Sequence, residues 1–289
     1  MTVPPPVEAV QLAFELAKPC QICPRLCKVD RLGGETGYCG VGELPLVSSA
    51  GPHFGEESVL VGRGGSGTIF LSGCNLGCVF CQNYSISHGL EGSQHKPQEI
   101  TRMMLLLERR GCENINFVTP THGTPWLMEA VRLARVDGLG VPIVYNCGGY
   151  ERLETLRLLE GTVDIYMPDA KYWDPEQAAL YSNAPDYPEV MRTALKEMHR
   201  QVGDLKVVNG VARRGLLIRH LVMPNNVAGS EQVLEFIAKE VSPHSHVNVM
   251  DQYRPTFRAH EFEKIARHPS YDEYGEARNC AVRLGLNLL

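Results

Sequence analysis

The chain has 289 residues, of which 44% are hydrophobic and 21% are charged, an ordinary composition for a globular protein with a packed core. Its formal net charge of −5 gives no reason to expect nucleic-acid binding or attachment to an anionic membrane. No apolar run reaches membrane-spanning length, and no apolar segment follows a basic N-terminus, so we expect a cytoplasmic protein without a membrane partner.

The N-terminal quarter of the chain differs from the rest. Residues 1–18 begin rich in proline and continue with a weakly helical pattern, and residues 19–65 are rich in Cys, Gly and Pro with little periodicity. A segment with so few apolar residues has no core of its own, and metal binding is one way to fold such a segment. We therefore predict a cysteine-rich, metal-binding module over residues 1–65.

From residue 66 onward, short apolar runs alternate with helical patterns. This alternation predicts parallel βα units with right-handed crossovers. We predict an α/β fold, a partial (β/α)6 TIM-like barrel over residues 66–255, followed by a helical extension over residues 256–289. The predicted strands are 67–73, 114–120, 142–147, 163–169, 216–224 and 246–253, and the predicted helices are 97–110, 125–137, 151–160, 187–201 and 230–240.

Three closely spaced cysteines follow the first predicted barrel strand. Cys74, Cys78 and Cys81 have the spacing CxxxCxxC. Thiolates hold iron–sulfur clusters, and most clusters need four of them. Three cysteines leave one iron without a protein ligand, and that iron can bind the amino and carboxylate groups of S-adenosylmethionine (SAM). Zinc is the alternative, but zinc spacing usually pairs two CxxC knuckles. We therefore predict a 4Fe–4S cluster at these cysteines.

Several segments together resemble one family. They read CPRLCKVDR, GETGYCGVG, PHFGEE, GSGTIFLSGCNLGCVFCQNYSIS, NFVTPTH, DIYMPDAKY, IRHLVMPN and MDQYRP. With them the chain resembles the radical SAM superfamily and, within it, the pyruvate formate-lyase activating enzyme-related branch with a cysteine-rich N-terminus. The resemblance covers nearly the whole chain. It implies an oxidoreductase that cleaves SAM to a 5′-deoxyadenosyl radical, which then abstracts hydrogen from a substrate.

The resemblance also implies residues near SAM. Phe80 matches an aromatic residue that packs near the adenine, and Asn83 lies in the same polar segment. Superfamily members usually have a GGE-like segment after the second strand, which contacts the SAM amino group. Here that position includes Thr121 and His122, whose hydroxyl and imidazole can hydrogen-bond an ammonium group, while the usual acidic residue is missing.

Four further residues, in or just after predicted strands, match activase motifs. Asn146 matches the Asn of a TNG segment, and Asp169 and Lys171 match an Asp-x-Lys pair that helps to hold SAM. Arg219 matches an inward-facing Arg, which needs a carboxylate partner if it is buried. In barrels of this kind the chemistry lies at the carboxyl ends of the strands. We therefore expect these four side chains near SAM. No catalytic residue is assigned.

A second cysteine cluster lies upstream. Cys20, Cys23, Cys27 and Cys39 have the spacing C-x2-C-x3-C-x11-C, a strong metal signal. A disulfide pair is disfavoured in a reducing, cluster-bearing protein. Structural zinc and an auxiliary 4Fe–4S cluster both fit the spacing, which does not separate them. The three remaining cysteines are isolated and predicted to be buried apolar side chains: Cys112, Cys147 and Cys280.

Two functions follow from the resemblance and the motifs. In the first, the radical takes a hydrogen atom from a backbone glycine of a partner glycyl radical enzyme. In the second, the protein acts directly on a small molecule, a peptide or an RNA residue. Either function needs an electron donor of the flavodoxin or ferredoxin type. A structural or carrier iron–sulfur protein is a third interpretation, but it leaves the polar strand ends unexplained.

Overall fold

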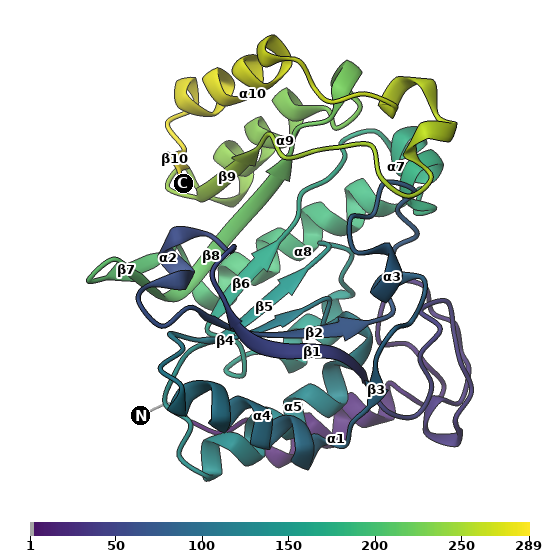
Figure 1. Ribbon diagram of the computed structural model, residues 1–289, viewed down its shortest axis with the longest axis vertical. Coiled ribbons are helices and arrows are strands. Elements are labelled where there is room, and N and C mark those ends of the chain that lie inside the picture. The colour runs from purple at the N-terminus through teal and green to yellow at the C-terminus, as the bar shows by residue number, and fades with distance from the viewer. Residues whose placement is uncertain (1–2) are drawn as a thin grey trace.

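The computed structural model describes residues 3–289, which form an α/β fold around one ten-stranded sheet (Figure 1). The strand order is β10-β9-β8-β6-β5-β4-β2-β1-β3, with β7 paired to β8. The strands are β1 (Leu46–His53), β2 (Ser66–Ser72), β3 (Ser93–Gln94), β4 (Ile115–Val118), β5 (Ile143–Cys147), β6 (Ile165–Pro168), β7 (Lys206–Val208), β8 (Val211–Leu221), β9 (His246–Met250) and β10 (Asn287–Leu288).

The sheet is mostly parallel, as the alternation of apolar runs and helices predicts. Every pairing from β2 through β4, β5, β6, β8 and β9 to β10 is parallel. The six predicted strands correspond to β2, β4, β5, β6, β8 and β9. The order is linear in the described part of the chain, so the sheet does not close on itself, as in a partial barrel.

Strand β1 was not predicted, and it lies within the range assigned to the N-terminal module. It pairs antiparallel with β2, so residues 46–53 are part of the sheet. Its sequence, LVSSAGPH, has small residues, a glycine and a proline in place of an alternating apolar pattern, because it lies toward the edge of the sheet. Strand β8 also begins earlier than predicted, at Val211, where it pairs with β7.

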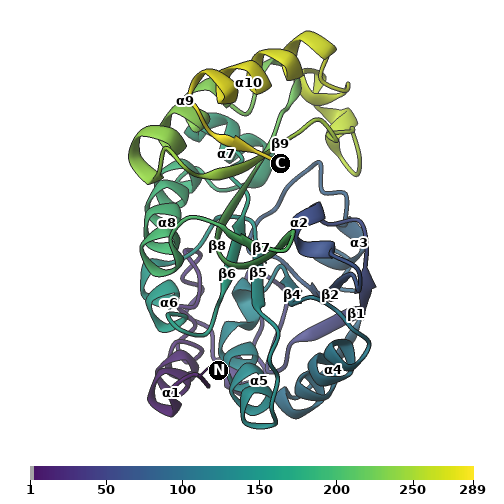
Figure 2. The ribbon, with the colours of Figure 1, turned by 90° about the vertical axis from the view of Figure 1, so that its left-hand side faces the viewer.

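Helices cover the outer side of the sheet, with α4 and α5 over β2 and β4 and with α6 and α8 farther along (Figures 1 and 2). No helix within residues 3–289 is long and apolar enough to span a bilayer. The α-helices are α1 (Val7–Glu15), α2 (Ser58–Val61), α3 (Tyr84–Ser87), α4 (Pro97–Arg109), α5 (Thr124–Val136), α6 (Leu153–Leu158), α7 (Pro175–Ser182), α8 (Tyr187–Val202), α9 (Ser230–Phe236) and α10 (Tyr271–Arg283).

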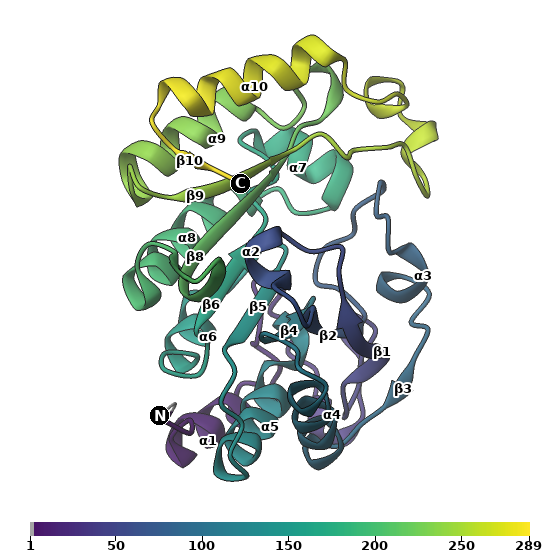
Figure 3. The same cartoon turned by 60° about the vertical axis from the view of Figure 1, so that its left-hand side comes forward.

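The short helix α2 covers the inner side of the curved sheet (Figure 3). Leu60 is fully buried there, in one apolar cluster with Val144, Ile165 and Leu217 from three parallel strands. Glu57, just before α2, accepts a hydrogen bond from Asn248 of β9 at 3.0 Å. The segment between β1 and β2 thus links β9 to the other end of the sheet and shields the inner core.

Candidate functional site

The three predicted cluster ligands lie in the loop that follows β2. The Sγ of Cys74 accepts a hydrogen bond from the amide of Leu76 at 3.3 Å. The Sγ of Cys78 lies 3.0 Å from the hydroxyl of Ser182, at the end of α7, and the Sγ of Cys81 lies 3.1 Å from the hydroxyl of Ser87 in α3. The loop is also tied to α7 through its backbone, since the amides of residues 77 and 79 donate to carbonyls of residues 182 and 181.

These cysteines line a cavity of about 210 Å³ together with residues from the carboxyl ends of the parallel strands. A polar rim at the ends of adjacent parallel strands is where chemistry is expected in barrel folds. Five of the predicted SAM contacts beyond the aromatic position line the same cavity: Asn83, Asn146, Asp169, Lys171 and Arg219. Phe80 lines it as well, and so does Cys147, which was predicted only to be a buried apolar side chain.

Four of these polar residues form one hydrogen-bonded network. The Nζ of Lys171 donates to Oδ2 of Asp169 at 2.6 Å, and the Nε of Arg219 donates to Oδ1 of Asp169 at 2.9 Å. The Nη2 of Arg219 also donates to Oδ1 of Asn146 at 2.7 Å. The arginine predicted to need a carboxylate partner therefore has one, and the network joins the ends of β5, β6 and β8.

The charged groups of the network affect one another and the nearby thiol of Cys78. Burial raises the pKa of Asp169, but Arg219 and Lys171 outweigh it and hold this pKa below its usual value. Burial also raises the pKa of the Cys78 thiol, while the ammonium of Lys171 opposes that rise. Lys171 therefore faces both an anionic carboxylate and a cysteine of the triad, and it favours the thiolate form that a metal needs.

Replacing Asp169 by asparagine should lower the free energy of unfolding by about 3 kcal/mol, because it leaves two partly buried cations without their anion. This is near the low end for breaking a buried pair, since the Asp169 side chain is still 17% exposed. Urea denaturation at pH 7 measures the change. Glu261→Gln is the control, because its pair with Arg258 is 54% exposed on both sides and should matter little. Equal effects of the two changes would show that the network does not act as a buried charge pair.

Aromatic rings and a side-chain amide connect the triad loop to the segment that follows β9. Phe80 is 6% exposed, and its ring centroid lies 5.7 Å from that of Tyr253, after β9. The Nε2 of Gln82 donates to the carbonyl of Gln252 at 3.1 Å. Tyr84 of α3 stacks on Phe257 with centroids 5.2 Å apart. The C-terminal end of β9 and the loop after it therefore pack on the triad loop from the opposite end of the sheet.

Thr121 and His122 do not line this cavity, although Thr119 beside them does. Both are 1% exposed, in the turn before α5. The hydroxyl of Thr121 donates to the buried carboxyl of Glu151 at 2.6 Å. Burial raises the pKa of Glu151 to about 7, and the hydrogen bonds from Thr121 and Tyr145 oppose that rise. The segment after the second barrel strand has no acidic residue of its own. The carboxyl group of Glu151, in the loop after β5, reaches this turn instead.

The N-terminal cysteine segment packs directly on the triad loop, alongside α3 (Figure 1). The Nε of Arg25 donates to the carbonyl of Asn75 at 2.8 Å, and its Nη1 donates to the carbonyl of Asn183. The Arg25 guanidinium also lies 3.8 Å from the ring centroid of Tyr38. The Tyr38 hydroxyl accepts a hydrogen bond from the Asn183 amide at 3.1 Å. Side chains of this segment therefore help to hold the loop that bears Cys74 and Cys78.

The four N-terminal cysteines lie near one another. Burial raises the pKa of Cys23, and Cys39, Cys20 and Cys27 each raise it further. Two hydrogen bonds between residue 20 and residues 28–29 bring Cys20 beside the Cys27 segment. All ten cysteines are free thiols in the described residues. Within residues 3–289 no three Cys, His, Asp or Glu side chains are gathered as ligands of a single metal ion. In an iron–sulfur cluster each thiolate binds a different iron. The thiols of a cluster therefore need not surround one ion.

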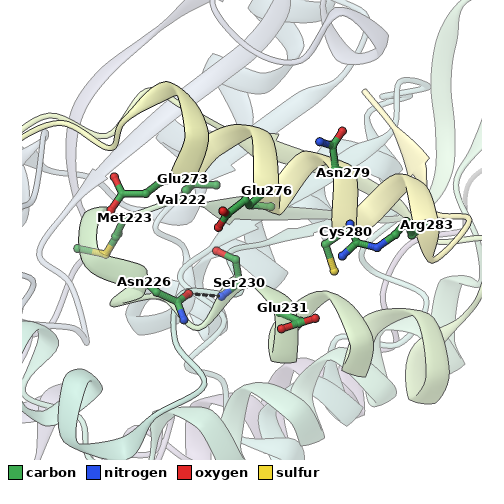
Figure 4. Close-up of a pocket in the computed structure, with 11 residues that line it drawn as sticks. Val222, Met223, Asn226, Ser230, Glu231, Glu273, Glu276, Asn279, Cys280 and Arg283 are labelled. Carbon is green, nitrogen blue, oxygen red and sulfur yellow. Dashed lines mark hydrogen bonds between the residues drawn. The ribbon is translucent and has the colours of Figure 1, made fainter.

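A second cavity, of about 380 Å³, lies between the end of β8, α9 and α10 (Figure 4). None of the seven clustered cysteines lines it. Glu273, at its edge, is bound by Arg267 at 2.7 Å and accepts from the amide of Ser270 as part of the N-terminal cap of α10. Arg267 is the main cause that lowers the pKa of Glu273 to about 2. This carboxylate is therefore structural, and the smaller cavity beside the cysteines is the candidate site.

A family model described as the radical SAM superfamily matches residues 68–237, more than half of the chain. The chain belongs to the radical SAM superfamily. A protein of Methanocaldococcus jannaschii, itself uncharacterized, is 33% identical over 288 residues, which cover 97% of this chain and 79% of that protein. The radical SAM assignment therefore rests on a match that includes the triad and most of the parallel strands.

Two solved structures resemble this radical SAM protein in fold. A radical SAM methyltransferase from Sphaerobacter thermophilus matches 78% of this chain with a TM-score of 0.53 and 14% identity. The chain spans 65% of the length of that methyltransferase, so the likeness concerns the fold alone. A domain of a pyruvate-formate lyase-activating enzyme from Bacteroides vulgatus matches 61% of this chain and 97% of its own length with 14% identity. Its TM-score is 0.46.

Several residues in and around the candidate site do not follow from the sequence. Ser182 and Ser87 contact triad thiols, Glu151 binds Thr121, and Asn75 binds Arg25. Each of these contacts except that of Ser87 joins segments at least 30 residues apart. Ser87 alone lies close to the motif, six residues after Cys81, and a hydroxyl there is the one signal that spacing offers.

Proposed function

We propose that the chain generates a 5′-deoxyadenosyl radical at Cys74, Cys78 and Cys81 and uses it to abstract hydrogen from a partner protein. The observation that carries this proposal is that all three thiols line one cavity, opposite the network of Asp169 and Arg219. Three thiols facing one cavity are the donor set that a 4Fe–4S cluster with one open iron needs. When bound, the cluster supplies the electron that cleaves SAM to methionine and the radical.

The chain's own residues would bind SAM and orient it. Asn146 and Asp169 offer oxygen acceptors to an ammonium group, and Lys171 and Arg219 offer donors to a carboxylate, all from the same cavity wall. Phe80 offers an apolar face beside the triad for an adenine ring. Because Asp169 already holds both cations, the site is preorganised before any ligand enters.

We propose a backbone glycine of a glycyl radical enzyme as the substrate. In this step the glycine Cα–H bond breaks and a C–H bond forms on the adenosyl carbon, so the products are 5′-deoxyadenosine and a glycyl radical. The electron comes from a flavodoxin- or ferredoxin-type donor. The support is the resemblance of the motifs to the activase branch, together with exposed Gln82 and Asn83 at the rim of the cavity, where a protein loop can approach.

The proposal includes a second metal centre, zinc or 4Fe–4S, at the four N-terminal cysteines. It divides the chain into a metal-binding module over 1–65, a radical SAM barrel over 66–255 and a helical extension over 256–289. Strand β1 then joins the module to the sheet, since it pairs with β2. The support is the mutual effect of the four thiols on the pKa of Cys23 and the contacts of Arg25 and Tyr38 with the barrel.

The test is anaerobic. The protein is reconstituted with iron and sulfide, reduced with flavodoxin and its reductase, and given SAM, and 5′-deoxyadenosine is quantified. A glycyl radical enzyme from the same genome is then added, and the organic radical is measured by electron paramagnetic resonance. We expect 5′-deoxyadenosine and, with the partner, a glycyl radical. Cleavage of SAM without a glycyl radical would favour direct action on another substrate, and absence of SAM cleavage with the partner present would contradict the radical chemistry.

A further inference from the structure

Arg31 is a buried cation in the N-terminal module. It begins the short 3-10 helix η1 (Arg31–Gly33), and only 1% of its surface is exposed. Its Nε donates to the carbonyl of Gly42 at 2.9 Å, and its Nη1 donates to the carbonyl of His122 at 2.6 Å. The guanidinium carbon lies 4.7 Å from the ring centroid of Trp126 in α5. Arg31 therefore lies between the 39–42 segment and the barrel.

Nothing in the described residues balances this charge. No carboxylate within residues 3–289 forms an ion pair with Arg31, and its buried Nη2 has no hydrogen-bond partner there. A guanidinium stays protonated in proteins, and a buried charge without a counter-charge is strongly unfavourable. Carbonyl groups and an indole ring orient the guanidinium but carry no net charge. An anion within reach of Nη2 would supply both the missing counter-charge and a hydrogen-bond partner.

The four N-terminal cysteines can supply such an anion. Arg31 binds the carbonyl of Gly42, which lies three residues after Cys39. The ring of Trp126, which the guanidinium contacts, packs in one apolar cluster with Cys20. Neutral thiols would not balance Arg31. Four thiolates around one zinc ion, or around an oxidised cubane core, leave a net charge of about −2. The charge of Arg31 thus suits a tetrathiolate centre of either kind, whereas the spacing of the thiols within residues 3–289, which are not gathered around a single ion, favours a cluster.

We propose that Arg31 is the buried counter-ion of a tetrathiolate metal centre held by Cys20, Cys23, Cys27 and Cys39. The proposal rests on the second metal centre of the proposed function and gives it a charge partner. In this arrangement metal and guanidinium stabilise each other. The metal-free protein carries an unbalanced buried cation, and the protein without Arg31 carries an unbalanced buried anion.

The experiment uses the full chain with Cys74, Cys78 and Cys81 all changed to alanine, so that only the N-terminal centre remains. Iron and zinc per chain are measured by mass spectrometry after anaerobic purification. We expect about one zinc or about four irons per chain, which also separates the two kinds of centre. A chain that binds neither metal would overturn the proposal. This protein lacks the triad and cannot cleave SAM, so the result is independent of radical formation.

Arg31→Met in this background should release its metal to a chelator roughly a hundredfold faster, as expected when a buried charge pair is broken. Arg31→Lys should restore most of the retention, because it keeps the charge. Lys28→Met is the matched control, since it removes one exposed cation from the same module and should leave retention almost unchanged. Equal metal release from Arg31→Met and the parent would contradict the role of Arg31.

Thermal unfolding after removal of the metal separates a counter-ion from an ordinary structural arginine. If Arg31 is the counter-ion, Arg31→Met unfolds at a lower temperature than its parent with metal, and at an equal or higher temperature without metal. An arginine with a purely structural role would lower the unfolding temperature in both states, and that result would overturn the proposal. If the metal-free chain is unfolded, the chelator rates alone decide.

Discussion

Replacing Cys78 by alanine should abolish 5′-deoxyadenosine formation and remove the iron bound at the triad. Cys78 is 8% exposed, lines the cavity and has its sulfur 3.0 Å from Ser182. Loss of an outer partner of a metal ligand costs roughly 10–100-fold in metal affinity or activity, so loss of a ligand should exceed this range. The measurement is 5′-deoxyadenosine and iron per chain after anaerobic reconstitution.

Two further variants make this result specific. Cys112→Ala is the matched control, because Cys112 is also buried, 3% exposed, but lies in the apolar cluster under α4 and not at the cavity. It should keep full SAM cleavage. Ser182→Ala removes only the hydroxyl beside Cys78 and should give an intermediate loss, within the 10–100-fold range. If Cys78→Ala cleaved SAM as well as Cys112→Ala, the triad would not be the radical-generating site.

The parts of the site that depend on strand ends could be predicted from the sequence. Asn146 and Asp169 are far apart in the chain, yet each lies at the end of an apolar run, and Arg219 lies within the apolar run of β8. In a parallel sheet such ends meet at one edge. The structure brings them together at 2.7 to 2.9 Å. The predicted strand positions, together with the resemblance to activase motifs, were therefore enough to locate this network.

Other parts could not be predicted, because they depend on contacts between segments with no periodic pattern. His122 is part of the predicted SAM turn, but its carbonyl binds Arg31 and its side chain does not line the cavity. The carboxyl group near Thr121 comes from Glu151, 30 residues away. Arg31 itself reads as an ordinary surface residue in a polar loop, and only packing against Trp126 shows that it is buried.

Replacing Gly73 by alanine should disrupt the contact between the N-terminal module and the triad loop. Gly73 directly precedes Cys74 and has a φ of 87°, a conformation that side chains rarely adopt. An added Cβ would lie 2.7 Å from the backbone carbonyl oxygen of Cys39 and 2.5 Å from a methyl group of Val41. Because the carbonyl belongs to the backbone, either the Cys39 segment or the triad loop has to move.

Gly111→Ala is the control that separates backbone strain from this clash. Gly111 has a φ of 89°, but no atom lies within 4 Å of an added Cβ. It should lower the free energy of unfolding by about 1–2 kcal/mol through strain alone. Gly73→Ala should lower the free energy of unfolding by about 1–3 kcal/mol more, because of overpacking. It should also lose the iron at the triad and most of its SAM cleavage. Urea denaturation and iron analysis of both variants test this. Equal losses in the two variants would mean that the contact between the Cys39 segment and Gly73 does not support the triad loop. A larger loss at Gly73 would show that this contact couples the N-terminal cysteine segment to the triad loop.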